Sequence, residues 1–386
     1  MVEIIRIKKN GLGLWLVLFL LTFVLHGMGQ AADPPKLPKN MIWSCYDVGS
    51  NGYTQASAVG NALLKAYNVR VRMIPSGTAI GRITPVLTKK CDVGILANEV
   101  YFSLEGLGDF ASREWGPQDL RVLCGAPATI GLATTAKSGI KTMRDLKGKR
   151  VPYVPGDAST NIKTEWGWLA FGGLTWDDVI KTTFPSYGAY IEALISRDVD
   201  VGTTASGNPK MYQLETSPQG LYWIPMPPED KEGWARVQKR LPFLYPLLET
   251  QGAGVPKEGV WQAGYRYPMV TVTADADIDF VYNLMKSIHQ TFDLYKDAHV
   301  YMPRWKVEQS AVPPIDAPFH EGAIKYLREI GVWKPEHDKW NNERIQHLGK
   351  VKALWNKTVE LADEKQLKAK EFPDFWLKER ERELGF

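Results

Sequence analysis

The sequence predicts a two-lobed α/β protein whose parallel-type sheets are flanked by helices, with a helical C-terminal extension. Strand and helix patterns alternate along most of the chain, an order that is typical of parallel βαβ units. The tripeptide Asp-Val-Gly occurs at 92–94 and again at 200–202, each time after an apolar helix pattern. A chance recurrence of so short a string is the alternative. The matching order of loops around both copies favours two lobes of similar topology.

The first lobe is predicted to contain strands at 41–46, 69–74 and 92–96. The segment 69–74, VRVRMI, alternates in polarity as a half-buried strand does. Pro85 lies within the second predicted helix, either in its first turn or at a kink. Apolar residues at helical spacing predict a helix after each of the first two strands, on the stripes Ala56, Val59, Leu63, Ala66 and Ile80, Ile83, Leu87.

The second lobe repeats this plan. A strand is predicted at 148–154, and the loop Pro155–Thr160 leads into a helix at 161–173 that ends on two glycines. The loop Pro185–Gly188 leads into a further helix, and the strand 198–202 follows it.

The remaining chain completes the body and adds an extension. Residues 225–256 are rich in proline and charge, which predicts a surface crossover. A strand at 267–277 and helices at 277–296 and 320–333 follow. From Pro335 onward an apolar stripe is predicted to dock on the body: Ile345, Leu348, Val351, Trp355 and Ala362.

These patterns predict a division into discontinuous lobes. The expected boundaries are lobe 1 at 41–130 and 265–333, lobe 2 at 131–264, a helical extension at 334–386, and hinge strands near 126–134 and 251–268.

Residues 1–31 have the organisation of a secretory signal peptide. Three basic residues precede the apolar run 12–25, and Gly29 and Ala31 supply the small residues of a cleavage site. Retention as an uncleaved membrane anchor is the alternative. In either case the rest of the chain is expected to be periplasmic or otherwise extracytoplasmic, and soluble because no second long apolar run follows.

The composition excludes several classes of function. The net charge is only +4 and no basic tract is interleaved with aromatic residues, so nucleic acid is not an expected partner. Cys45, Cys91 and Cys124 permit either one disulfide or three buried thiols. No CxxC, HExxH or histidine-rich cluster is present, so no metal or other cofactor is expected.

Polar loops are predicted at the carboxyl ends of the strands, where open α/β sheets bind ligands. Their glycine, serine and threonine residues leave N–H and hydroxyl groups free, which predicts binding of a carboxylate without any buried arginine or lysine. Taken singly, each loop is more often an ordinary helix cap than a binding site, and the two interpretations carry equal weight only for the six loops together. The six loops are Gly49–Thr54, Pro75–Thr78, Ala97–Glu99, Pro155–Thr160, Pro185–Gly188 and Thr204–Asn208.

Individual side chains near these loops permit more than one interpretation. Tyr53 and Tyr187 occupy matching loops and suit either ligand contact or core packing. Arg82 is expected in a structural or solvated ion pair rather than on a second ligand carboxylate. Glu99 and Asp157 do not suit an anion site; facing the cleft they would favour an amino group, a water or a cation, and otherwise they cap helices.

Several of these stretches together resemble the TAXI family, the extracytoplasmic solute receptors of a class of TRAP transporters. They are Gly49–Tyr53, Ser76–Thr78, CDVGILANE at 91–99, TMRDLKGKRVPYVPGDAST at 142–160 and GAIKYLREIGVW at 322–333. The resemblance covers about 41–333 and implies a hinged periplasmic-binding-protein fold. By position it implies ligand contacts at Tyr53, Ser76, Gly77, Thr78, Asn98, Asp157, Ala158, Ser159, Thr160 and Tyr187.

The resemblance implies a binding protein rather than an enzyme. Such a protein captures a small organic acid or amino acid between its lobes and delivers it to the permease subunits of a TRAP transporter. The sequence departs from the family at Asp157, in the short loop SGTAIGR at 76–82, and in the length of the segment beyond Trp333. These departures weigh against a glutamate-type ligand and favour another acid or a less acidic solute.

Two other functions compete with this interpretation. An exported hydrolase would need a nucleophile beside a base, but GxSxG is absent and no histidine beyond the signal region lies near a loop serine motif. An exported sensor that docks on a signalling protein would share the fold and the cleft.

Overall fold

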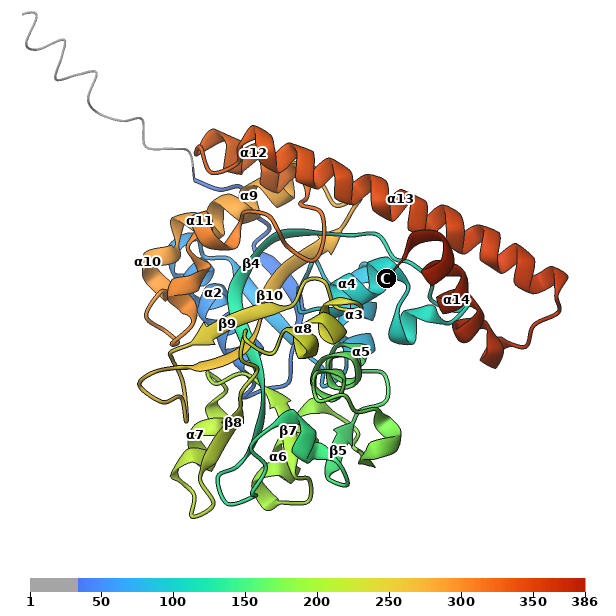
Figure 1. The fold of residues 1–386 in the computed structure, drawn as a ribbon. Coiled ribbons are helices and arrows are strands. Elements are labelled where there is room, and N and C mark those ends of the chain that lie inside the picture. The colour runs from blue at the N-terminus through green and yellow to red at the C-terminus, as the bar shows by residue number, and fades with distance from the viewer. Residues whose placement is uncertain (1–33, 386) are drawn as a thin grey trace, which may run out of the picture. The chain divides into compact units, whose positions relative to one another are not determined.

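The long antiparallel strands β4 (Leu120–Thr135) and β10 (Val260–Thr273) join the two lobes of the protein. The computed structural model describes residues 34–385, so the predicted signal segment 1–31 lies outside the described residues. Within that range, eight strands form one mixed sheet, in the order β2 (Arg70–Pro75), β1 (Asn40–Cys45), β3 (Val93–Leu96), β10, β4 and β7 (Val201–Thr204), with β8 (Leu221–Ile224) beside β4 and β9 (Tyr245–Glu249) beside β10. Figure 1 shows β4 and β10 running alongside each other through the centre of the fold.

The first lobe follows the predicted order of strands and helices. Its strands β1 (Asn40–Cys45), β2 (Arg70–Pro75) and β3 (Val93–Leu96) are parallel, with β1 in the middle. Its helices are α2 (Asn51–Tyr67), α3 (Ala79–Leu87) and α4 (Glu99–Glu105), followed by the short 3-10 turn η1 (Gly108–Ala111). Pro85 lies inside α3, as the sequence predicts.

The second lobe begins after β4. The strands β5 (Arg150–Tyr153) and β6 (Ile180–Thr183) form a separate parallel pair, whereas β7 (Val201–Thr204) and β8 (Leu221–Ile224) pair with β4. The helix after β5 has an α-helical part, α5 (Ala158–Ile162), and a π-helical part, η3 (Lys163–Leu169). The other helices and turns are η2 (Met143–Leu146), η4 (Trp176–Asp178), α6 (Tyr187–Ser196), α7 (Pro209–Thr216) and α8 (Lys231–Gln238).

The two Asp-Val-Gly strands occupy equivalent places in the lobes. β3 pairs antiparallel with β10, where Leu96 lies opposite Met269. β7 pairs antiparallel with β4, where Thr204 lies opposite Gly131. Each strand therefore ends beside one of the long connecting strands, and the loops that follow both strands are brought to the boundary between the lobes.

The chain returns to the first lobe after β9 (Tyr245–Glu249) and β10. Helices then cover this end of the sheet: α9 (Ile278–Gln290), α10 (Phe292–Tyr295), η5 (Met302–Trp305), α11 (Val307–Ser310) and α12 (Glu321–Glu329). These observations confirm the predicted two-lobed fold class, while the exact lobe boundaries stay predictions.

A C-terminal extension follows Trp333 and contains α13 (Pro335–Glu364), η6 (Ala369–Glu371) and α14 (Phe372–Leu384). Figure 1 shows α13 as a long helix with α14 folded back against it. The docking stripe is buried at Leu348, Val351, Trp355 and Ala362. Ile345 was expected in this stripe but is 38% exposed, because the face of α13 that meets the body at this point carries Asn341, Arg344 and Leu348 instead.

Other sequence expectations have clear outcomes in the described part of the chain. Cys45, Cys91 and Cys124 are buried free thiols. Burial raises the pKa of Cys45 and of Cys124 to about 12, which keeps both thiols protonated and unreactive. Among the described residues, no helix has both the length and the hydrophobicity that a membrane span requires.

Candidate functional site

A cavity with an empty volume of about 460 Å³ lies where the two lobes meet. That figure includes space open to solvent; the part that water-sized molecules can occupy is about 40 Å³, so the cavity is small and closely lined in this structure. Both lobes and both long strands line it. The lining residues are Tyr46, Asn51, Arg82, Ala97, Ile130, Asp157, Ser159, Thr160, Lys163, Tyr187, Thr203, Thr204, Ala205, Tyr265 and Tyr267.

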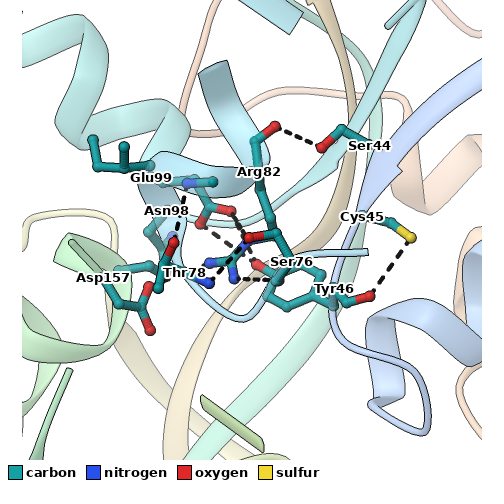
Figure 2. A network of polar contacts seen from close by, with 12 residues as sticks. Ser44, Cys45, Tyr46, Ser76, Thr78, Arg82, Asn98, Glu99 and Asp157 are labelled. Carbon is teal, nitrogen blue, oxygen red and sulfur yellow. Dashed lines mark hydrogen bonds and ion pairs between the residues drawn. The ribbon is translucent and has the colours of Figure 1, made fainter. Parts of the chain in front are cut away.

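Arg82 is the centre of a buried polar network on the first-lobe side of the cavity. Its side chain projects from α3, is 1% exposed, and donates from Nε to Glu99 Oε1 at 2.9 Å and from Nη2 to Asp157 Oδ1 at 3.3 Å. Its guanidinium also lies 4.0 Å from the centroid of the Tyr46 ring. Figure 2 shows Arg82 surrounded by these partners and by the Ser76 carbonyl, which accepts from Nη1.

The two carboxylates bound to Arg82 differ in their electrostatics. Burial alone would raise the pKa of Glu99, but the charge and hydrogen bond of Arg82 lower it. Burial raises the pKa of Asp157 in spite of the same guanidinium. Glu99 is therefore the structural counter-ion of Arg82, whereas Asp157 is incompletely compensated.

Lys163 brings a second buried cation to the cavity. It is the first residue of η3 and is 3% exposed. Its Nζ donates to Asn98 Oδ1 and Ser159 Oγ, both at 3.0 Å, and lies 5.3 Å from the Tyr265 ring centroid. Burial lowers the pKa of Lys163 to about 8, against the attraction of Glu99 and then Asp157. Because its close partners are neutral, Lys163 offers the cavity an ammonium without a directly bonded carboxylate.

Two buried polar atoms of residues that line the cavity lack hydrogen-bond partners among the described residues. Asn51 accepts from Gln55 through Oδ1, but its Nδ2 donates to no described residue. Asp157 uses Oδ1 for Arg82, while its Oδ2 accepts no hydrogen bond from the described residues. Buried polar groups are satisfied in the great majority of cases, so this orphan donor and orphan acceptor are both available to a polar group that enters the cavity.

Hydroxyl groups form the part of the second-lobe wall that β7 and α6 supply, beside the charged Asp157 and Lys163 of the same lobe. The Tyr187 hydroxyl contacts Thr204 Oγ1 at 2.7 Å and accepts from Asn208 Nδ2 at 2.9 Å. Thr203 Oγ1 accepts from Trp168 Nε1 at 2.8 Å. Burial raises the pKa of Tyr187 to about 12, so the phenol stays neutral and can both donate and accept. This part of the wall supplies polarity without charge.

The structure brings four of the ten site residues implied by the family resemblance directly to the cavity: Asp157, Ser159, Thr160 and Tyr187. Asn98 lies behind them, fully buried against Lys163. Ala97, Thr204 and Ala205, from the loops that follow the two Asp-Val-Gly strands, also line the cavity.

The other five implied residues lie outside the cavity lining. Thr78 is the N-cap of α3 and accepts from the Gly81 N–H, and Ser76 faces the network through its carbonyl. The remaining three are Gly77, Ala158 and Tyr53. The Gly77 carbonyl accepts from the Tyr187 N–H at 3.0 Å, Ala158 donates its N–H to Asp109, and Tyr53 is a partly exposed residue of α2.

Gly77 is a point of close approach between the lobes. A Cβ atom at this position would lie 2.4 Å from Ser186 Cβ and 2.6 Å from Asp47 Oδ2. The glycine therefore permits the contact between the Pro75–Thr78 and Pro185–Gly188 loops rather than a contact with ligand.

The expectation of a carboxylate site without buried arginine or lysine is wrong. Arg82 and Lys163 are both buried and both line the cavity. The loops alone were expected to supply the donors, but several of their N–H and hydroxyl groups are consumed by caps and interlobe contacts. The sequence marks Lys163 only by its position four residues after Ser159, which places both side chains on the same face of a helix. Asn51, within the Gly49–Thr54 loop, was also missed.

The two lobes and the long strands that connect them form the two-lobed α/β fold of periplasmic binding proteins. A sequence profile of the NMT1-like family matches residues 48–331. The chain therefore belongs to the NMT1-like family.

Solved structures of low sequence identity are similar to most of the chain. A protein from Bordetella bronchiseptica RB50 is 17% identical, with a TM-score of 0.47 over 78% of this chain and 91% of that one. The alkanesulfonate-binding protein SsuA from Xanthomonas axonopodis pv. citri, bound to MOPS, is 16% identical, with a TM-score of 0.43 over 79% and 84%. The arginine-bound amino acid ABC transporter protein AbpA from Streptococcus pneumoniae is 12% identical, with a TM-score of 0.39 over 69% and 96%.

Proposed function

We propose that this protein is the extracytoplasmic solute-binding subunit of a TRAP-type transporter of the TAXI class. It captures a small organic acid or amino acid between its lobes, performs no chemistry on it, and delivers it to a membrane permease. The observation that carries this proposal is the buried Lys163 ammonium in an interlobe cavity that also contains an orphan donor and an orphan acceptor. A solute that completes these interactions would bind both lobes at once.

Closure of the lobes around the solute is the proposed mechanism. The predicted lobes already touch through Arg82–Asp157, through Asn98–Lys163, and through the Gly188 N–H, which donates to Asp47 Oδ2 at 3.3 Å. A solute favours this closed arrangement only by the difference between its affinities for the closed and open forms. Contacts to both lobes supply that difference, because the open form can offer one half of them.

The polar groups favour an α-amino acid within the proposed solute class. Lys163 and the Asn51 Nδ2 donor suit a carboxylate, which accepts hydrogen bonds only. Asp157 Oδ2 suits an ammonium, which donates only. A zwitterion with both groups would satisfy all three positions and bring no net charge into the cavity.

A thermal-shift screen of the mature protein tests the proposed function. Amino acids and small mono- and dicarboxylic acids are the test solutes, and sugars and polyamines are the controls. A bound solute at about one hundred times its dissociation constant should raise the unfolding temperature by about 5 °C. Absence of a shift across the whole acid panel, or turnover of any member, would contradict the proposal.

The variant Asp157→Asn tests the amino-acid preference. Loss of the Asp157 carboxylate should lower the affinity for α-amino acids by about tenfold to a hundredfold, because a charge-assisted hydrogen bond to the solute's ammonium group is lost. Matched acids without the amino group should bind as well as before or more tightly, because a negative charge leaves the cavity. Calorimetry with alanine and lactate, or glutamate and 2-hydroxyglutarate, makes this comparison. If the amino acid and its matched hydroxy acid lose affinity equally, a contact between Asp157 and the ammonium group is contradicted.

A further inference from the structure

The C-terminal extension contacts the layer of residues directly behind the cavity. The family match ends at residue 331, just before α13 begins at Pro335. An apolar cluster attaches the extension to the body, and within it Trp376 Nε1 donates to the Gly106 carbonyl at 2.7 Å. Gly106 is the C-cap of α4, the helix that begins with Glu99. The extension is therefore attached to an element whose other end lies at the ligand site.

Polar contacts strengthen this attachment at Glu105, the last residue of α4. The Glu105 side chain is fully buried, and three groups of the extension converge on its carboxylate. Arg344 and Arg380 approach it at 2.5 Å, and His347 Nε2 lies 3.0 Å from Oε1. A buried carboxylate requires such compensation, so α4 depends on the extension for the charge balance of its C-terminal end.

The same extension holds the segment 316–319 from behind. Arg344 Nη2 donates to the Asp316 carbonyl at 3.3 Å, and Asn341 Oδ1 accepts from the Phe319 N–H at 2.8 Å. Asp316 is 3% exposed and its carboxylate accepts from Asn98 Nδ2. Asn98 then accepts from Lys163 through Oδ1 at 3.0 Å. A continuous chain of contacts thus runs from Arg344 through Asp316 and Asn98 to the ammonium in the cavity.

The orientation of the Asn98 amide depends on the charge of Asp316. An ionised Asp316 accepts from the amide nitrogen, which leaves the amide oxygen for Lys163. A protonated Asp316 would donate instead and would favour the flipped amide, which presents N–H groups to the Lys163 ammonium. Burial raises the pKa of Asp316 to about 6; Asn98, Lys163, Arg344 and Arg266 act in the opposite direction. Tyr101 and Tyr245 are the other titratable groups near it.

We propose that α13 is a positioning element of the solute site, in which Arg344 keeps Asp316 ionised and so holds Asn98 and Lys163 in their binding arrangement. The inference rests on the proposed function for the role of Lys163. Arg344 itself touches no solute and acts only through Asp316 and Asn98. The extension is thereby an added part of the binding apparatus rather than an inert appendage.

The test compares Arg344→Met with Arg344→Lys and with the control Arg113→Met. Arg113 also attaches the extension, through a partly exposed pair with Asp363 at 2.7 Å, but has no contact with Asp316. The titration midpoint of the Asp316 carboxyl carbon, assigned with Asp316→Asn, is measured by ¹³C NMR of the full mature chain. It should rise by about one pH unit in Arg344→Met and stay within about 0.3 unit in the other two variants.

A second measurement follows the dissociation constants of L-alanine and lactate from pH 5 to 8. With the midpoint shifted by one unit, Arg344→Met should bind about fivefold more weakly than wild type at pH 6 and about equally at pH 8. A general loss of packing would weaken binding at both pH values. If Arg344→Met does not fold, Glu105→Gln/Arg344→Met removes the buried carboxylate together with its cation and keeps the comparison available.

The outcomes separate this inference from the proposed function. An Asp316 midpoint that stays in place in a folded Arg344→Met variant overturns the inference whether or not a solute binds. A shifted midpoint with an unchanged pH profile of binding overturns the positioning role and leaves the proposed function intact. Failure of wild type to bind any acid overturns the proposed function, and the role of α13 in binding falls with it.

Discussion

The variant Lys163→Met should lose solute affinity by about a hundredfold while keeping its fold. A hydrogen bond to a charged group contributes about 1.5–3 kcal/mol, and tenfold in affinity corresponds to about 1.4 kcal/mol. The Lys163 ammonium is at the upper end of this range because it is 3% exposed and shielded from solvent. Titration calorimetry with the best solute of the thermal screen measures the loss.

The free energy of unfolding of Lys163→Met should rise or stay unchanged, even though its affinity for solute falls. Burial disfavours the Lys163 ammonium, so an apolar side chain of similar length removes a desolvation cost. Lys181→Met is the matched control, because Lys181 belongs to the same lobe but is exposed beside Tyr153 and Trp176. A Lys163→Met protein that binds solute as wild type does would remove Lys163 from the site.

The pH dependence of binding provides a check on the charge of Lys163. Its pKa of about 8 is lowered by burial, so the ammonium is present below pH 8 and is lost as the pH rises through that value. Solute affinity in wild type should therefore fall above pH 8, and Lys163→Met should show no such fall. A flat wild-type profile from pH 7 to 9.5 would mean that a bound carboxylate does not rely on this cation.

Most of the fold was accessible from the sequence because its signals are local and periodic. The strand 69–74 alternates in polarity, and the α2 stripe of Ala56, Val59 and Leu63 is buried as predicted. The paired Asp-Val-Gly strands indicated the two lobes because the same order of helix, strand and polar loop surrounds each copy, and the structure pairs each strand with one of the long connecting strands. The antiparallel placement of β4 and β10 was less accessible, since it depends on pairing between segments more than one hundred residues apart.

The site was only partly accessible, because burial of a charged residue depends on tertiary contacts. Ser159 and Thr160 were predicted from their loop, and both line the cavity. Lys163 carries no such local signal, since a lysine in a helix is usually solvated. Its burial arises from Asn98 and Tyr265, which are distant in sequence and approach only after the lobes have packed.

Arg82 is a second charged residue whose burial depends on tertiary contacts, and its substitution has the largest expected effect on the stability of the fold. The sequence permitted a structural or solvated ion pair, and the structure shows a fully buried cation shared by Glu99 and Asp157. Arg82→Met should destabilise the protein by about 3–5 kcal/mol, because it leaves two buried carboxylates without their cation. Chemical denaturation at pH 7 measures this, with the exposed Arg72→Met as a control that should change stability by less than about 0.5 kcal/mol.

The pH dependence of this loss distinguishes charge from packing. In wild type Arg82 lowers the pKa of Glu99, so that carboxylate stabilises the fold above its unfolded pKa and ceases to do so as the pH falls through its folded value. Without Arg82, burial raises the pKa of Glu99 and of Asp157 above their unfolded values, and the folded state then gains stability as they take up protons. The deficit of Arg82→Met should therefore shrink between pH 7 and pH 5. The double variant Glu99→Gln/Arg82→Met should recover part of the lost stability at pH 7. If Arg82→Met loses the same stability at pH 7 and at pH 5, the loss is due to packing around Tyr46 rather than to charge.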